Sequence, residues 1–140
     1  MTDAVRRIEY YYTTLPDSPG EGSRLASVLR DAGVNLVAML AFPIGGGRSQ
    51  VDLVPDGPES TEALRRAAGQ AGVELSEAKR AFLVQGDDRP GATAEHFAKL
   101  AAAGINVTAA AGVASGEGRY GVVIWVGRSD YERAAGAIGA

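Results

Sequence analysis

Two short turns with the pattern Asp-x-Pro-Gly carry residue types suited to binding a small charged molecule. Their members are Asp17, Ser18, Pro19 and Gly20 in the first turn, and Asp88, Arg89, Pro90 and Gly91 in the second. Proline stiffens such a turn, glycine lets a ligand approach the backbone, and the free N–H groups of a helix that starts there attract a carboxylate. The acidic side chain nearby can receive an ammonium group. A molecule with both charges is a free amino acid.

A purely structural role is the alternative for each turn. Aspartate at such a position commonly caps the turn by accepting hydrogen bonds from its own backbone, which requires no ligand. The same choice exists for Asn35 and Asn106, which follow the glycines Gly33 and Gly104 after the next predicted helix. Either asparagine can touch a ligand or simply close the turn from helix to strand, and the sequence leaves both interpretations open.

The two turns belong to a tandem repeat. Asp17 and Asp88 are 71 positions apart (88 − 17 = 71). The blocks 33–36 and 104–107 have the same offset, as do the Gly-Arg pairs at 47–48 and 118–119. Three blocks in one register identify internal duplication at a domain-sized period. We expect one repeat over residues 1–79 and a second over residues 80–140.

The composition is that of a globular protein that is neither basic nor membrane-spanning. The chain has 140 residues, 46% of them hydrophobic and 22% charged, with a formal net charge of −3. It contains no cysteine, no run of basic residues, and no apolar run long enough to span a bilayer. Nucleic-acid and membrane partners are therefore not expected. The first residues also lack the apolar core of a signal peptide, which favours a cytoplasmic location.

Hydrophobic periodicity predicts the order strand, helix, strand, strand, helix in both copies. The expected elements are strands 2–14, 34–42 and 50–54 with helices 21–32 and 60–71, then strands 73–85, 105–114 and 120–126 with helices 92–103 and 130–138. Ser60 is a candidate N-cap, and Gly33 and Gly72 are placed to end helices. The predicted fold class is α+β, with two ferredoxin-like βαββαβ repeats whose helices cover one face of antiparallel sheets.

The second copy lacks its last strand, because that strand would fall beyond Ala140. Residues 2–8 at the front of the long first strand can supply it. We expect the strands 2–14 and 73–85 to pair antiparallel, with paired residue numbers summing to about 87, which joins the two sheets side by side. Strand 120–126 is apolar on both faces, with Val123 and Trp125 on one of them. A loop over Trp125 or a homodimer packed through the sheet face would cover it, and we favour the homodimer.

The two Asp-x-Pro-Gly turns, each followed by a helix and a Gly-x-Asn segment, resemble the ACT domain, a regulatory amino-acid-binding module. The two copies span nearly the whole chain. The resemblance implies ferredoxin-like units that associate side by side or face to face and bind an amino acid at an interface between them. It also implies ligand contacts from Asp17, Asp88, Asn35 and Asn106. The chain departs from the family pattern at Gly22 and Thr93, where a leucine usually stands.

No catalytic constellation emerges from the sequence. The only histidine, His96, is expected to pack or to lie partly exposed rather than act as a ligand, and no cluster suits a metal or a cofactor. We therefore expect a non-enzymatic tandem ACT protein that senses a free amino acid and acts on a target enzyme or regulator. The alternatives are a structural dimer or protein-docking module with no small ligand, and a small enzyme using Asp87, Asp88 and Arg89.

Overall fold

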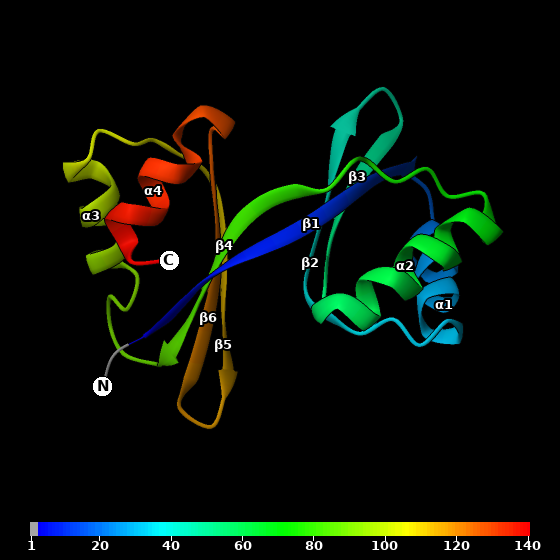
Figure 1. Ribbon diagram of the computed structural model, residues 1–140. Coiled ribbons are helices and arrows are strands. Elements are labelled where there is room, and N and C mark those ends of the chain that lie inside the picture. The colour runs from blue at the N-terminus through cyan, green and yellow to red at the C-terminus, as the bar shows by residue number, and fades with distance from the viewer. Residues whose placement is uncertain (1–2) are drawn as a thin grey trace. The chain divides into compact units, whose positions relative to one another are not determined.

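The computed structural model describes residues 3–140 as an α+β protein with six strands and four α-helices (Figure 1). In chain order these are β1 (Ala4–Pro16), α1 (Glu21–Asp31), β2 (Leu36–Gly45), β3 (Arg48–Pro55), α2 (Gly57–Ala71), β4 (Lys79–Asp87), α3 (Ala94–Ala102), β5 (Val107–Gly116), β6 (Arg119–Val126), a 3-10 turn η1 (Arg128–Asp130) and α4 (Tyr131–Ile138). None of these helices has the length and apolar character needed to cross a lipid bilayer.

Contacts divide the chain into two compact units. The first unit is Glu9–Lys79, and the second unit combines the residues up to Ile8 with Arg80–Ala140. The strand β1 therefore contributes its first residues to the second unit and the remainder to the first. In each unit two helices lie on one face of an antiparallel sheet: α1 and α2 in the first, α3 and α4 in the second (Figure 1).

The central strand pairs have matching registers in the two units. In the first unit β3 lies between β1 and β2, with Tyr11 opposite Leu53. In the second unit β6 lies between β4 and β5, with Phe82 opposite Ile124. These two pairs are related by the 71-residue offset. Each outer hairpin also has two register shifts, and their positions are related by the same offset.

Each unit has its own hydrophobic core. The core of the first unit forms where α1 and α2 pack on the sheet, through Tyr11, Leu25, Leu29, Val51, Leu53 and Leu64. The core of the second unit includes Phe82, Leu100, Ile124 and Tyr131, with Val5 packed against it. The rings of Phe82 and Tyr131 stack at 4.4 Å between centroids. The inward side chains recur with a period of 2 in the strands and of about 3.6 in the helices, which is why these elements form where the hydrophobic pattern predicts them.

The predicted strand over residues 73–85 is wrong in its first part. Residues 73–78 have no regular secondary structure, and β4 begins at Lys79. The reason lies at Ser76, whose backbone N–H donates to the carbonyl of Tyr12 at 2.8 Å and whose Oγ accepts from the Tyr12 N–H at 2.9 Å. A side chain thus takes the hydrogen bond that a strand carbonyl would have accepted. The segment follows β1 without completing a regular ladder.

Two further expectations change in detail. Ser60 is not an N-cap: α2 begins at Gly57, and Ser60 lies buried within it, where its Oγ accepts from the backbone N–H of Asn35 at 3.0 Å. Gly72 ends α2 in the left-handed conformation as expected, with φ of 69°.

Val123 and Trp125 are only 5% and 7% exposed in the single chain. The homodimer stays a prediction, but these two residues no longer require one.

Candidate functional site

The first Asp-x-Pro-Gly turn connects the end of β1 to the start of α1. The backbone N–H of Asp17 donates to the carbonyl of Gly47 at 2.8 Å, which fixes the turn against the β2–β3 hairpin. Gly20 has φ of 92° and stands at the N-cap of α1, where no side chain caps the helix. The Asp17 carboxylate accepts a hydrogen bond from Ser49 Oγ at 3.0 Å. It lies exposed beside helix-start amides that no side chain has capped.

The second turn repeats this arrangement before α3. The backbone N–H of Asp88 donates to the carbonyl of Gly118, again at 2.8 Å, and Gly91 has φ of 68°. The helix starts after Thr93, which makes no side-chain capping bond. Within the described part of the chain, the Asp88 side chain is exposed and forms neither a hydrogen bond nor an ion pair. Within the described residues, neither Asp17 nor Asp88 accepts a hydrogen bond from the backbone of its own turn, which a purely structural role would require.

The asparagines do not join the turns within a unit. Asn35 follows α1, so the 11-residue helix separates it from Asp17 by roughly 16 Å. Its Nδ2 donates to Asp56 Oδ2 at 3.2 Å and its carbonyl accepts from the Asp56 N–H, which ties it to the start of α2. Asn106 is exposed at the corresponding place after α3. A small ligand cannot touch the turn and the asparagine of one unit together.

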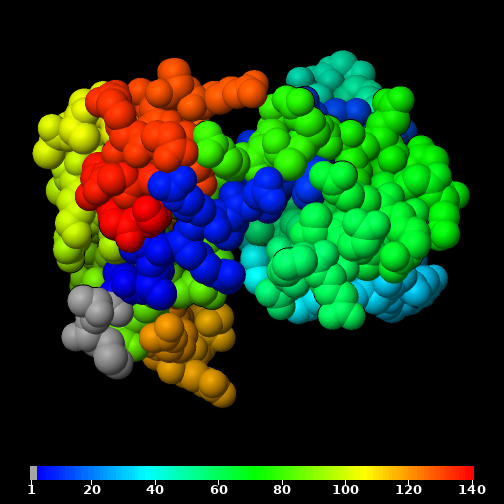
Figure 2. Space-filling view, viewed as in Figure 1, coloured from blue at the N-terminus to red at the C-terminus, as the bar shows by residue number. Residues whose placement is uncertain are grey.

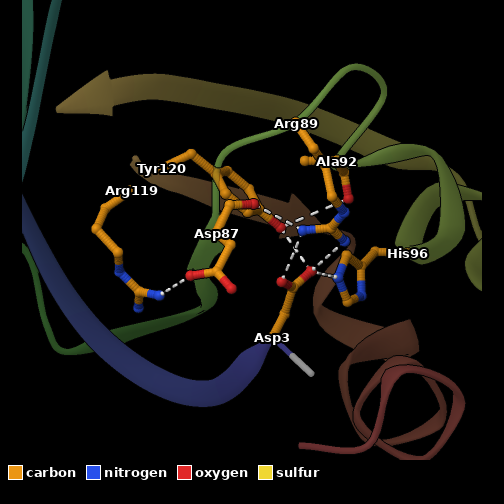
Figure 3. Close-up of polar contacts among 7 residues, drawn as sticks. All are labelled: Asp3, Asp87, Arg89, Ala92, His96, Arg119 and Tyr120. Carbon is orange, nitrogen blue, oxygen red and sulfur yellow. Dashed lines mark hydrogen bonds and ion pairs between the residues drawn. The ribbon is translucent and has the colours of Figure 1, made fainter. Parts of the chain in front are cut away.

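Arg89, the second residue of the second turn, is engaged by a residue that the sequence analysis did not single out (Figure 3). Its Nη1 and Nη2 donate to Asp3 Oδ1 and Oδ2 at 3.1 and 3.2 Å. Tyr120 OH donates to Asp3 Oδ2 at 2.7 Å, and His96 Nε2 lies 2.7 Å from the same oxygen. We call these four residues, Asp3, Arg89, His96 and Tyr120, the Asp3 cluster.

The Asp3 cluster places a charged carboxylate inside the second unit. The Asp3 side chain is only 4% exposed, and the hydrogen bonds from Arg89 hold its pKa well below the usual 3.8 despite the opposing effect of burial. Burial and the hydrogen bond to Asp3 raise the pKa of Tyr120 to about 12. A Cβ at Gly86 would overlap the Asp3 carboxylate, so glycine is required there. Arg89 is thus held by the protein itself.

The four members of this cluster come from four separate segments of the chain, which explains why sequence patterns missed it. Asp3 immediately precedes β1, His96 lies on the inner face of α3, and Tyr120 lies on β6 directly opposite Gly86 of β4. His96 is 4% exposed, so it is packed, as the sequence predicted. Its contact with the Asp3 carboxylate was not predicted. The available signals were a lone histidine on a buried helix face and a strand glycine next to the turn.

The first unit has an open cleft lined by Leu15, Leu25 and Glu74, which are 71 positions from Gly86, His96 and Asp3 of the second unit. The cleft has a volume of about 640 Å³ and lies between α1, the end of β1 and residues 71–76. Glu21 and Arg24 of α1, Arg48 of β3, and Glu74 and Ser76 supply polar side chains, and Leu25 and Val28 supply apolar ones. Such a volume is in the usual range for small-molecule sites. Among residues 3–140, no three His, Asp or Glu side chains come together to hold a metal ion.

The sequence matches no protein-family model and no curated protein. Solved structures do resemble it. Protein BT0572 from Bacteroides thetaiotaomicron has a TM-score of 0.80 at 16% identity, covering 96% of this chain and 88% of that one. The regulatory subunit of aspartate kinase from Thermus thermophilus, in its ligand-free form, has a TM-score of 0.62 at 21% identity, covering 98% and 94%.

The same regulatory subunit from Thermus flavus has a TM-score of 0.60 at 20% identity, covering 99% of this chain and 95% of that one. The chain has the fold of these regulatory subunits. The likeness supports an ACT-type α+β fold and extends over nearly the full length of each chain. At these identities it establishes the fold alone, so the ligand and the role of the protein are argued from its own residues.

Proposed function

We propose that the protein is a non-catalytic regulatory module that binds a free amino acid at its Asp-x-Pro-Gly turns. The observation that carries the proposal is the state of the two turn aspartates. Both lie exposed shortly before a helix whose start no side chain caps, and neither caps its own turn. A carboxylate on the helix-start amides and an ammonium at the aspartate would satisfy both. The fold shared with aspartate kinase regulatory subunits gives independent support.

We also propose that the two units are duplicated copies, with boundaries near residues 79 and 80 and residues 2–8 in place of the last strand of the second copy. The matching registers and the matching hydrogen bonds of Asp17 and Asp88 support this. Val5 packs in the core of the second unit, and Arg7 Nη1 donates to Glu132 Oε1 at 3.0 Å, as an integral strand requires. Thr2 lies outside the described residues. In the space-filling view the blue residues at the start of β1 lie against the red residues of α4 (Figure 2).

A protein-docking module is the second candidate, because one outer strand exposes large apolar side chains. On β2, Met39 is 59% exposed and Ile44 is 49% exposed. Apolar side chains on an edge strand suit a protein partner or a second copy of the chain. This role would leave the turns without a ligand. It is also compatible with amino-acid sensing, in which such a surface passes the signal to a target enzyme or regulator.

A thermal-shift screen of the full chain against the twenty amino acids tests the proposal. An amino acid at about 100 times its dissociation constant should add roughly 2.7 kcal/mol of stability, enough to raise the melting temperature by several degrees. The double variant Asp17→Ala with Asp88→Ala should lose the shift. Asp31→Ala, which removes another exposed aspartate near α1, should keep it. A full shift in the double variant, or none in the wild type, would contradict amino-acid binding at the turns.

A further inference from the structure

The open cleft of the first unit has an apolar wall that is well ordered by its own packing. Leu25 of α1 is only 6% exposed and belongs to the core of the unit. Val73 and Leu75 on the opposite side pack against that core, and Val28 completes the wall. Ser76 fixes the segment that carries Val73 and Leu75 by its two hydrogen bonds to Tyr12. The cleft is therefore built by buried contacts on both sides.

The charged side chains of the cleft differ in how they are engaged. Arg24 and Glu21 neutralise each other in an ion pair of 2.6 Å. Arg48 donates from Nη2 to Thr14 Oγ1 at 2.7 Å but, among the described residues, forms no ion pair. Glu74 likewise has no hydrogen bond or ion pair within that part of the chain. One cation and one anion thus line the cleft with their charges unpaired, together with the apolar wall.

The second unit cannot offer the same space. Its position 86 is a glycine, and the Asp3 carboxylate occupies the room beside it; the residue 71 positions earlier is Leu15. The other cluster members Arg89, His96 and Tyr120 correspond in the same way to Ser18, Leu25 and Ser49. Every residue that holds the internal carboxylate is therefore changed in the first unit. The counterpart of Asp3 itself is Glu74 (74 − 3 = 71), which is exposed at the cleft, so the first unit has no buried carboxylate there and the cleft is open to a ligand from solution.

We propose that this cleft binds one α-amino acid with an apolar side chain, with its carboxylate on Arg48, its ammonium on Glu74 and its side chain against Leu25, Val28, Val73 and Leu75. A zwitterion satisfies one free cation and one free anion, and the wall requires an apolar group between them. This inference goes beyond the proposed binding at the turns: the cleft is a separate site, and residues 17–20 of the first turn do not line it. In the second unit Asp3 fills the corresponding space beside Gly86, so this cleft site occurs once per chain.

Calorimetric titration of the full chain with L-leucine tests the assignment. We expect one cleft site per chain and weaker binding of L-aspartate and L-lysine. Arg48→Gln should weaken L-leucine binding roughly tenfold or more and leave the affinity for L-leucinamide unchanged, because that probe lacks the carboxylate. Glu74→Gln should weaken L-leucine equally and leave N-acetyl-L-leucine, which lacks the ammonium, unchanged. Equal losses for leucine and the matching probe would overturn the proposal.

A steric pair of variants supplies a second test on the same helix. Val28→Trp should fill the cleft and abolish L-leucine binding, whereas Ala26→Trp, at an exposed position of α1, should preserve it. If Val28→Trp does not fold, the Arg48 and Glu74 variants decide alone. Unchanged binding in Val28→Trp with loss in the Asp17→Ala and Asp88→Ala double variant would overturn the cleft assignment and leave amino-acid sensing intact. No binding of any amino acid would overturn both.

Discussion

Asp3 and Arg89 form a two-point ion pair that connects the start of β1 to the turn before α3. Both guanidinium Nη atoms donate to the carboxylate, at 3.1 and 3.2 Å, across a separation of 86 positions in the chain. The carboxylate is buried and also accepts from Tyr120. One of the two turns predicted to bind a ligand is thus held in place by a carboxylate of the protein itself.

Replacing Asp3 should destabilise the second unit. Asp3→Asn removes the charge that pairs with Arg89 and turns one of the two acceptor oxygens into an NH2 donor, so the buried groups around it lose an acceptor. This costs about 1–3 kcal/mol in the free energy of unfolding. The matched control is Asp87→Asn, which breaks the half-exposed ion pair with Arg119 at 2.8 Å and should cost less than about 1 kcal/mol. Urea unfolding at pH 7 measures both. Equal effects of the two substitutions would contradict the special role of Asp3.

The contribution of Asp3 should disappear in acid. The pKa of Asp3 is lowered in the folded protein, so its stabilisation is fully present above the usual value of 3.8 and is lost as the pH falls through the lower folded value. The difference in unfolding free energy between wild type and Asp3→Asn should therefore be constant from pH 7 to about pH 5. Below about pH 4 it should narrow. If this difference in unfolding free energy stays constant down to pH 2, the pKa of Asp3 is not lowered in the folded protein, which would contradict its ion pair with Arg89.

Tyr120 should give the opposite dependence at high pH. Its pKa is raised from 10.0 to about 12 by burial and by its hydrogen bond to Asp3, so the neutral hydroxyl contributes stability below pH 10 that is lost as the pH rises toward 12. Tyr120→Phe should cost about 1 kcal/mol at pH 8. Urea unfolding at pH 8 and pH 11 should show this cost shrinking. If the difference in unfolding free energy between wild type and Tyr120→Phe is the same at pH 8 and pH 11, the role of the Tyr120 hydroxyl is contradicted.

The order and type of the elements could be predicted because the periodic apolar residues, the turn glycines and the internal duplication all indicate the same pattern. Leu25 and Leu29 show the helix period, and Gly72 ends α2 as expected. The Asp3 cluster could not be predicted, because its four members come from four separate segments and only the tertiary fold brings them together. The irregular segment 73–78 was missed for a related reason: the competing hydrogen bond from Ser76 has no signature in the hydrophobic pattern.

Deleting residues 1–7 should destabilise the second unit and leave the first unit nearly unchanged. The deletion removes Asp3, the packing of Val5 in the second core, and the ion pair between Arg7 and Glu132. Amide hydrogen exchange reports the two units separately. Protection should fall for Phe82 and Ile124 but persist for Leu53 of the first unit. The control Arg6→Ala, at an exposed position of β1, should change neither unit. Equal loss in both units, or none in the second, would contradict the role of the N-terminal residues as its missing strand.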